Sequence, residues 1–211
     1  DAAGKDGTVR KVFDSVNPTG VQVTSFKVPT PLERRHDFLW RSHAVVPPRG
    51  NIGVFNRSYY EEVLVVRVHA DTLLPPHLRE REDVWSTRFG LINEFERLLH
   101  LNGTMVVKCF LHISKEEQRQ RFMVRQKDPK HHWKLSASDF EERPFWNDYQ
   151  EAYEKMLPAT STKLAPWHII PADRKWVRNY HIARLVARTL EKMKLQWPEV
   201  ADLALLKRKF K

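Results

Sequence analysis

The stretch DAAGKDGTVRKVF, residues 1–13, places a Gly-Lys pair directly before a segment with the apolar spacing of a helix. A phosphate-binding loop reads G-x-x-x-x-G-K-[ST] and opens a helix, so that backbone N–H groups and the lysine bind phosphate. Here Gly4 and Gly7 let the backbone turn its N–H groups toward a phosphate, and Lys5 supplies a mobile positive charge. Gly-Lys alone is a weak signal, but its position before an amphipathic helix favours a phosphate-binding loop over a chance dipeptide.

The acidic residues of this stretch depart from the usual pattern. Asp6 follows Lys5 where Ser or Thr would hold magnesium, and the leading glycine is absent because the chain starts at Asp1. A carboxylate beside phosphates is repulsive unless a cation lies between them. We therefore expect Asp1 to be a magnesium ligand that replaces the missing hydroxyl. For Asp6 the favoured interpretation is a first-turn charge that complements the helix dipole.

The rest of the chain alternates between strand and helix patterns. Short apolar runs predict strands at 21–26, 51–58, 104–113 and 167–172, and helical spacing predicts helices at 8–16, 32–46, 84–103, 139–157 and 174–193. Segment 59–69 fits either, and Ser114 predicts a helix start with Glu117 completing a capping box. The alternation predicts one α/β domain over residues 1–211, with a parallel sheet covered on both faces. We expect its central strand upstream of Asp1.

Ligands bind at the carboxyl ends of the strands in such a sheet, which predicts three positions: the opening loop, Asn56-Arg57 and the turn after Ile113. Asn56 stands where a Walker-B type carboxylate would be. The oxygen of its amide could coordinate a metal ion, and the amide could orient a water. Arg57 can clamp a phosphate with two N–H groups, and a local Asn-Arg turn is an equal alternative. Glu61 fits a solvated helix residue better than a metal ligand, although it could reach a metal.

A basic segment follows the third strand. Arg121 and Arg125 are four residues apart and share one helix face, and Lys130 and Lys134 come shortly after them. A lid that closes over phosphates needs such a row of charges, so we predict a lid at about residues 115–145. A solvated basic helix is the alternative.

Composition narrows the class of protein. The 211 residues carry a net charge of +10, which suits a polyanion such as nucleic acid, acidic lipid or a chain of phosphates, or simply a solvated basic surface. No apolar run reaches the ~18 residues of a membrane helix, so we expect no membrane partner. Cys109 lies in an apolar run, which predicts a buried thiol and, as the single cysteine, no disulfide within the chain. A cytoplasmic location fits this cysteine usage.

Three longer motifs carry a resemblance that reaches from Asp1 to about Met193. DAAGKDGTVRKVFDSVNPTGVQVTSFKVPT, FNRSYYEEVLVVRVH and DPKHHWKLSASDFEERPFWNDYQEAYEKML resemble the second family of polyphosphate kinases. The resemblance implies a P-loop kinase fold, a three-layer αβα sandwich with a parallel central sheet and a helical lid. It also implies reversible, magnesium-dependent phosphoryl transfer between inorganic polyphosphate and nucleotides, with Mn²⁺ as a substitute metal. Homo-oligomers, dimer or tetramer, and adenine nucleotides, with guanine nucleotides as the alternative, are further implications.

The resemblance also assigns roles to residues. The family's loop Gly-x-Asp-x-x-Gly-Lys-Asp-Gly maps onto Asp1, Gly4, Lys5, Asp6 and Gly7, which implies a metal ligand at Asp1, with Asn56 or Glu61 as further candidates. The implied catalytic residues are Asp1, Lys5, Arg57, Arg121 and Arg125. The implied phosphate- and nucleotide-binding residues are Ala3, Gly4, Lys5, Asp6, Gly7, Thr8, Asn56, Arg57, Lys130 and Lys134. Many members carry Asp at the position of Asn56, and the Asn form resembles the branch that accepts both AMP and ADP.

Two other functions remain as alternatives at this point. An ATP-dependent nucleoside monophosphate kinase shares the fold and the lid, but a single nucleotide needs far less positive surface than this chain carries. A non-catalytic nucleic-acid-binding protein would fit the charge, but no recognition motif appears and the basic residues concentrate in the lid-like segment.

Overall fold

The structure, a computed structural model, describes residues 2–197. In this part of the chain the strands are β1 (Val21–Ser25), β2 (Ile52–Asn56), β3 (Lys108–His112) and β4 (Trp167–Pro171). β1 pairs in parallel with β2, and β3 pairs in parallel with β4. The predicted parallel sheet is therefore present as two parallel pairs, and all four predicted strands form.

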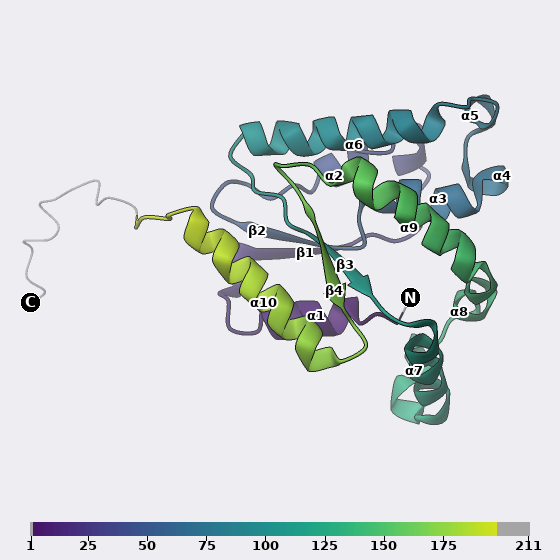
Figure 1. The fold of residues 1–211 in the computed structure, drawn as a ribbon. Coiled ribbons are helices and arrows are strands. Elements are labelled where there is room, and N and C mark those ends of the chain that lie inside the picture. Colours follow the sequence, from purple (N-terminus) through teal and green to yellow (C-terminus); the bar gives the residue numbers. More distant parts are fainter. Residues whose placement is uncertain (1, 198–211) are drawn as a thin grey trace, which may run out of the picture.

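Helices cover the strands on both faces (Figure 1). Figure 1 shows α1 and α10 on one side of the strands and α6 on the other, and α1 packs on α10 as α6 packs on α9. The α-helices are α1 (Lys5–Val12), α2 (Trp40–His43), α3 (Val65–Val68), α4 (Ala70–Leu73), α5 (Pro76–Arg79), α6 (Val84–Leu101), α7 (Lys115–Lys127), α8 (Ala137–Glu141), α9 (Trp146–Thr160) and α10 (Lys175–Lys192). Short 3-10 turns are η1 (Pro18–Gly20), η2 (Glu33–Arg35), η3 (Tyr59–Val63), η4 (Pro129–Lys134) and η5 (Arg143–Phe145). None of the helices within residues 2–197 has the length and apolar character needed to cross a membrane.

The apolar core lies where η3, α6 and α9 meet. Its buried side chains are Tyr59, Tyr60, Val63, Leu64, Phe89, Ile92, Phe95, Ala152 and Met156. Apolar residues recur every three or four positions along α6, so one face of this helix enters the core and the other faces solvent. This packing fixes η3, which continues directly from the end of β2.

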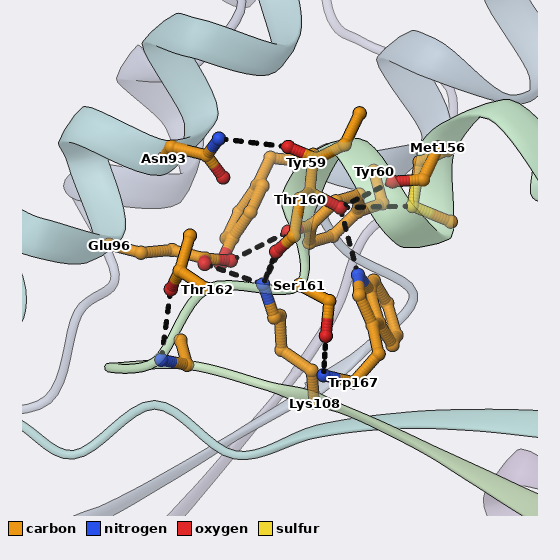
Figure 2. A network of polar contacts seen from close by, with 12 residues as sticks. Tyr59, Tyr60, Asn93, Glu96, Lys108, Met156, Thr160, Ser161, Thr162 and Trp167 are labelled. Carbon is orange, nitrogen blue, oxygen red and sulfur yellow. Dashed lines mark hydrogen bonds and ion pairs between the residues drawn. The ribbon is translucent and has the colours of Figure 1, made fainter.

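A buried polar network ties the same elements together at the amino end of β3 (Figure 2). Nζ of Lys108 donates to Oε2 of Glu96 at 2.6 Å, to the carbonyl of Thr160 at 2.6 Å and to the hydroxyl of Tyr60 at 2.9 Å. The hydroxyls of Tyr59 and Tyr60 both donate to Oε1 of Glu96 at 2.8 Å. Burial and the neighbouring carboxylate raise the pKa of both tyrosines, so both stay protonated as donors. The network lies at the opposite end of β3 from the predicted ligand positions.

Two predicted helices are wrong as continuous elements. Segment 32–46 divides into η2 and α2, because His36 is extended and the carboxylate of Asp37 accepts from the N–H of Leu39 at 2.9 Å, which starts a new turn. Segment 139–157 divides into α8, η5 and α9, with Pro144 inside η5. The ambiguous segment 59–69 is helical, as η3 and α3.

Two local predictions also need correction. Ser114 accepts from the N–H of Glu117 at 3.1 Å, as a cap should, but the box is not closed. The N–H of Ser114 donates to Oδ1 of Asp173 at 2.8 Å, and the carboxylate of Glu117 binds Arg121 instead. The thiol of Cys109 is only partly covered rather than fully buried, and burial still raises its pKa to about 11. The basic tail KRKFK, residues 207–211, for which we expect a frayed and exposed end, lies outside the described residues.

Candidate active site

The opening loop makes a sharp reversal directly before α1. Ala2 and Gly4 both adopt left-handed backbone, with φ of 70° and 95°. The N–H and the hydroxyl of Thr8 both bond the carbonyl of Gly4, at 3.0 and 3.1 Å, which closes the first turn of the helix. The predicted ligand Asp1 lies outside the described residues, so its metal role stays a prediction.

Positive side chains from three distant segments meet around Lys5. Burial lowers the pKa of Lys5 most, and the charges of Arg57 and Arg125 lower it further, while Glu61 and Asp6 partly offset them. Arg57 sits at the end of β2 with a left-handed φ of 67°, a conformation that costs about 1 kcal/mol for a residue with a Cβ. Its Nη1 lies 3.8 Å from Oε2 of Glu61. The fold thus brings three of the predicted catalytic residues to one place.

Asn56 and Asp6 form a direct pair across this site. Nδ2 of Asn56 donates to Oδ1 of Asp6 at 2.6 Å. Asp6 is the acidic residue in the first turn of α1, as the dipole interpretation requires, but it also holds the end of β2 beside the loop. Two oxygen-bearing side chains, an amide and a carboxylate, therefore stand next to Lys5. These are hard donors of the kind that Mg²⁺ prefers.

The side chain of Arg121, on α7, binds the backbone of the opening loop. Nε of Arg121 donates to Oε1 of Glu117 at 2.8 Å. Its Nη atoms donate at 2.7–3.2 Å to four backbone carbonyls, those of Ala2, Ala3, Ala172 and Asp173. These five contacts equal the number of N–H groups on a guanidinium. In this arrangement the guanidinium joins the opening loop to the β4–α10 turn, and the predicted contact with a transferring phosphoryl group stays a prediction.

The other predicted lid residues lie further along the same segment. Nη1 of Arg125 is 3.5 Å from Oδ2 of Asp139 in α8. Lys130 is exposed on η4, and Nζ of Lys134 lies 4.9 Å from the ring centroid of Trp133. Within residues 2–197, no recorded contact joins either lysine to the opening loop. The structure therefore brings Arg125 to the site and leaves Lys130 and Lys134 apart from it.

Arg178 on α10 is a site residue that sequence reasoning missed. Its Nη1 donates to the carbonyl of Ala3 at 2.7 Å, and the side chain is buried. A Cβ placed on Gly4 would lie 2.0 Å from this Nη1, so the guanidinium fills the space beneath the loop. The available signal was its position one turn before Ile182, on the apolar face of the helix, where a charged residue requires a buried partner.

A cavity of about 260 Å³ opens at the carboxyl ends of β3 and β4. Its lining residues are His112, Pro171, Ala172, Asp173, Arg174 and Val177. The third predicted ligand position, the turn after Ile113, borders it. No cluster of three or more His, Cys, Asp or Glu side chains suited to a metal occurs in the described part of the chain.

Known proteins resemble this chain over nearly its whole length. The family model for polyphosphate kinase 2 matches residues 1–198. An ADP-polyphosphate phosphotransferase of Rhodopseudomonas palustris is 50% identical over 203 residues, covering 94% of this chain and 70% of that protein. An AMP/ADP-polyphosphate phosphotransferase of Meiothermus ruber is 50% identical over 199 residues, covering 94% of this chain and 72% of that protein.

A solved structure extends the likeness to three dimensions. The crystal structure of polyphosphate kinase 2 from Arthrobacter aurescens superposes with a TM-score of 0.90 at 42% identity, over 98% of this chain and 71% of that one. The two parallel strand pairs, their helical layers and the loop before α1 are accordingly an α/β fold of the P-loop kinase type. On these grounds the chain belongs to the polyphosphate kinase 2 family.

Proposed function

We propose that this protein transfers the terminal phosphoryl group between inorganic polyphosphate and nucleotides, converting AMP or ADP to ADP or ATP and back. The observation that carries the proposal is that Arg57 and Arg125 lie within electrostatic reach of Lys5, the first residue of α1. Positive charges from three segments around one helix N-terminus suit a chain of phosphates. The names of the relatives at 50% identity support the same substrates.

The reaction requires little covalent chemistry from the side chains of the protein. The acceptor oxygen of AMP or ADP is already an anion near neutral pH, so no strong base is needed. Catalysis then consists of alignment and of neutralising the charge on the transferring group. Lys5 and Arg57 bind the donor phosphates at the loop, and Arg125 binds the equatorial oxygens of the transferring group. Because one anhydride is exchanged for another, the reaction runs in both directions.

A divalent cation fits the side chains around Lys5. Asp1 is the proposed ligand, together with phosphate oxygens, and Asn56 and Asp6 are a pair of side chains with hard oxygens at the start of α1. Glu61 is a weaker candidate because it lies against Arg57. Mg²⁺ bound there, or Mn²⁺ in its place, would supply positive charge that neutralises the phosphates during transfer.

The segment at 115–145 is proposed as the lid of a single P-loop kinase domain. Figure 1 shows α7 projecting from the body of the molecule. Arg125 belongs to the last turn of this helix. Arg121 would contact a transferring phosphoryl group only after releasing the loop carbonyls, so we assign it a positioning role in the arrangement described above. Lys130 and Lys134 would reach the polyphosphate chain only if η4 moves toward the loop.

Acceptor choice, oligomeric state and cellular location are further parts of the proposal. Asn56 in place of a carboxylate removes one negative charge, which supports acceptance of both AMP and ADP, as the name of the Meiothermus ruber relative states for that protein. We further propose adenine nucleotides as acceptors, a homodimer or homotetramer, and a cytoplasmic site of action, where nucleotides and magnesium are abundant.

A comparison of polyphosphate with ATP as the phosphoryl donor distinguishes this proposal from its alternatives. AMP is incubated with Mg²⁺ and either long-chain polyphosphate or ATP, and the nucleotides are resolved by ion-exchange chromatography. We expect ADP to form with polyphosphate. Product with ATP alone would identify a nucleoside monophosphate kinase. No product with either donor, together with salt-sensitive binding of DNA, would identify a nucleic-acid-binding protein.

A further inference from the structure

We propose that Arg178 is a positioning residue that orients the backbone of the opening loop for polyphosphate binding and places a fixed positive charge beneath it. This inference rests on the proposed function. It concerns a residue of α10, which lies more than 170 positions along the chain from the loop that it contacts.

The first argument is the orientation of the peptide groups. In a planar trans peptide the C=O and the following N–H point in opposite directions. Nη1 of Arg178 holds the carbonyl of Ala3 at 2.7 Å, and Nη1 of Arg121 holds the carbonyl of Ala2 at 2.9 Å. The N–H groups of Ala3 and Gly4 therefore point away from the two guanidiniums, toward the open side of the loop. Within residues 2–197, no backbone carbonyl accepts from the N–H of Gly4.

The second argument is charge. Arg178 is 2% exposed, and it donates to neutral oxygens. The carbonyl of Ala3 accepts from Nη1 at 2.7 Å, and Oδ1 of Asn179 accepts from Nη2 and Nε at 3.0 and 3.2 Å. No carboxylate of the described residues lies within ion-pair distance of it. Burial lowers the pKa of Arg178, and the nearby charge of Arg121 lowers it further. A buried cation of this kind is costly unless an anion compensates it, and bound phosphate would do so.

The third argument is fit between the loop and the guanidinium. Gly4 has φ of 95°, and a Cβ at this position would lie 2.0 Å from Nη1 and 2.9 Å from Cζ of Arg178. The loop can approach the arginine only because position 4 lacks a side chain. Thr8 strengthens the contact, since its hydroxyl bonds the carbonyl of Gly4 and lies 3.5 Å from Oδ1 of Asn179.

Three variants of Arg178 and one control test the inference, and the third variant, Arg178→Ala, is used for rescue by added guanidinium. Arg178→Gln removes both the positive charge and the planar set of guanidinium N–H donors. Arg178→Lys keeps the charge but not the planar set of donors. Arg184→Gln is the control, because Arg184 lies on the same helix, is exposed and has a weak contact at 3.4 Å with the hydroxyl of Tyr180. The measurements are the Kd of inorganic tripolyphosphate by calorimetry, and kcat and KM for polyphosphate with ADP.

We expect Arg178→Gln to weaken tripolyphosphate binding about 10- to 100-fold, the usual effect of removing a group that orients another ligand. Arg178→Lys should fall between Arg178→Gln and wild type, and guanidinium added to Arg178→Ala should restore part of the binding. Arg184→Gln should bind as wild type does. A folded Arg178→Gln protein with wild-type affinity and KM would overturn the inference while leaving the proposed function intact, whereas a wild-type protein that does not use polyphosphate would overturn the proposed function.

A measurement on the wild-type protein covers the case in which the variants do not fold. The amide resonance of Gly4 and the Nε–H resonance of Arg178 are followed by NMR during titration with tripolyphosphate. We expect both to shift at saturation, because the phosphate meets the Gly4 N–H and compensates the buried charge. Saturable binding that leaves both resonances unchanged would contradict the inference.

Discussion

Replacement of Asn56 by Asp tests the electrostatics of the site in the unliganded protein. Nδ2 of Asn56 now donates to Oδ1 of Asp6 at 2.6 Å. In Asn56→Asp two carboxylates face each other, and the donor is lost. Two like charges about 4 Å apart repel by about 4 kcal/mol at an effective dielectric constant of ~20 and by about 1 kcal/mol in water. Because Asp6 is exposed, the cost lies toward the lower figure, at about 1–2 kcal/mol.

The predicted observable is a metal-dependent melting temperature. In EDTA at pH 8, Asn56→Asp should melt about 2–8 °C below wild type, at ~2–4 °C per kcal/mol for a chain of this size. Mg²⁺ should recover the loss, because a cation between the carboxylates removes the repulsion. The deficit should also shrink as pH falls, since mutual repulsion raises the pKa of one carboxyl and its protonation relieves the pair.

The matched control is the swapped variant Asp6→Asn with Asn56→Asp. It has the same charge as wild type and restores an amide–carboxylate pair, so its melting temperature in EDTA should lie close to that of wild type. Equal melting temperatures for wild type and Asn56→Asp in EDTA would refute the reasoning. The single variant should also change the ratio of kcat/KM for AMP and ADP, and an unchanged ratio would contradict the role of Asn56 in acceptor choice.

Three further outcomes follow from individual side chains. Cys109, whose pKa burial raises to about 11, should react with iodoacetamide at pH 8 roughly 100-fold more slowly than an unperturbed thiol, and a normal rate would show an accessible thiolate. Glu96→Ala should lower the unfolding free energy in urea by about 3–5 kcal/mol, because Lys108 is left buried without its carboxylate, whereas exposed Glu94→Ala should cost less than about 1 kcal/mol. The kcat/KM for polyphosphate should fall on the alkaline side below pH 10.5, because the pKa of Lys5 is lowered and its charge is lost as pH rises, and Lys5→Arg should move this limb upward.

Sequence patterns predicted the elements whose signal is local and strong. The four strands and the helices α6 and α10 form where apolar periodicity placed them. Segment 32–46 failed because periodicity does not register a single side chain that competes for the backbone, as Asp37 does for the N–H of Leu39. The capping box at Ser114 failed because Arg121, one turn along the same helix, takes the carboxylate of Glu117, and because Asp173 of a distant segment accepts from the N–H of Ser114.

In the site, too, residues with a local sequence signal were predicted, and residues placed by long-range contacts were not. The Gly-Lys motif and strand-end positions located Lys5 and Arg57, and α7 brings Arg125 near them. Arg178 could not be found from the motif, because its contact with Ala3 joins segments at the two ends of the described chain. The carbonyl contacts of Arg121 were likewise invisible to spacing, since a basic residue on a basic helix has the same pattern whether it faces solvent or backbone.

The central claim is that the opening loop binds polyphosphate while its terminal phosphoryl group is transferred to a nucleotide. The initial rate of ATP formation tests this claim most directly. ADP, Mg²⁺ and long-chain polyphosphate are mixed with wild type or with Lys5→Ala, and ATP is followed by luminescence. We predict ATP formation by wild type and, for Lys5→Ala, a kcat/KM that falls by about 100-fold or more, equivalent to about 3 kcal/mol of transition-state binding. Absence of ATP with the wild-type protein, or near-normal turnover by Lys5→Ala, would contradict the account.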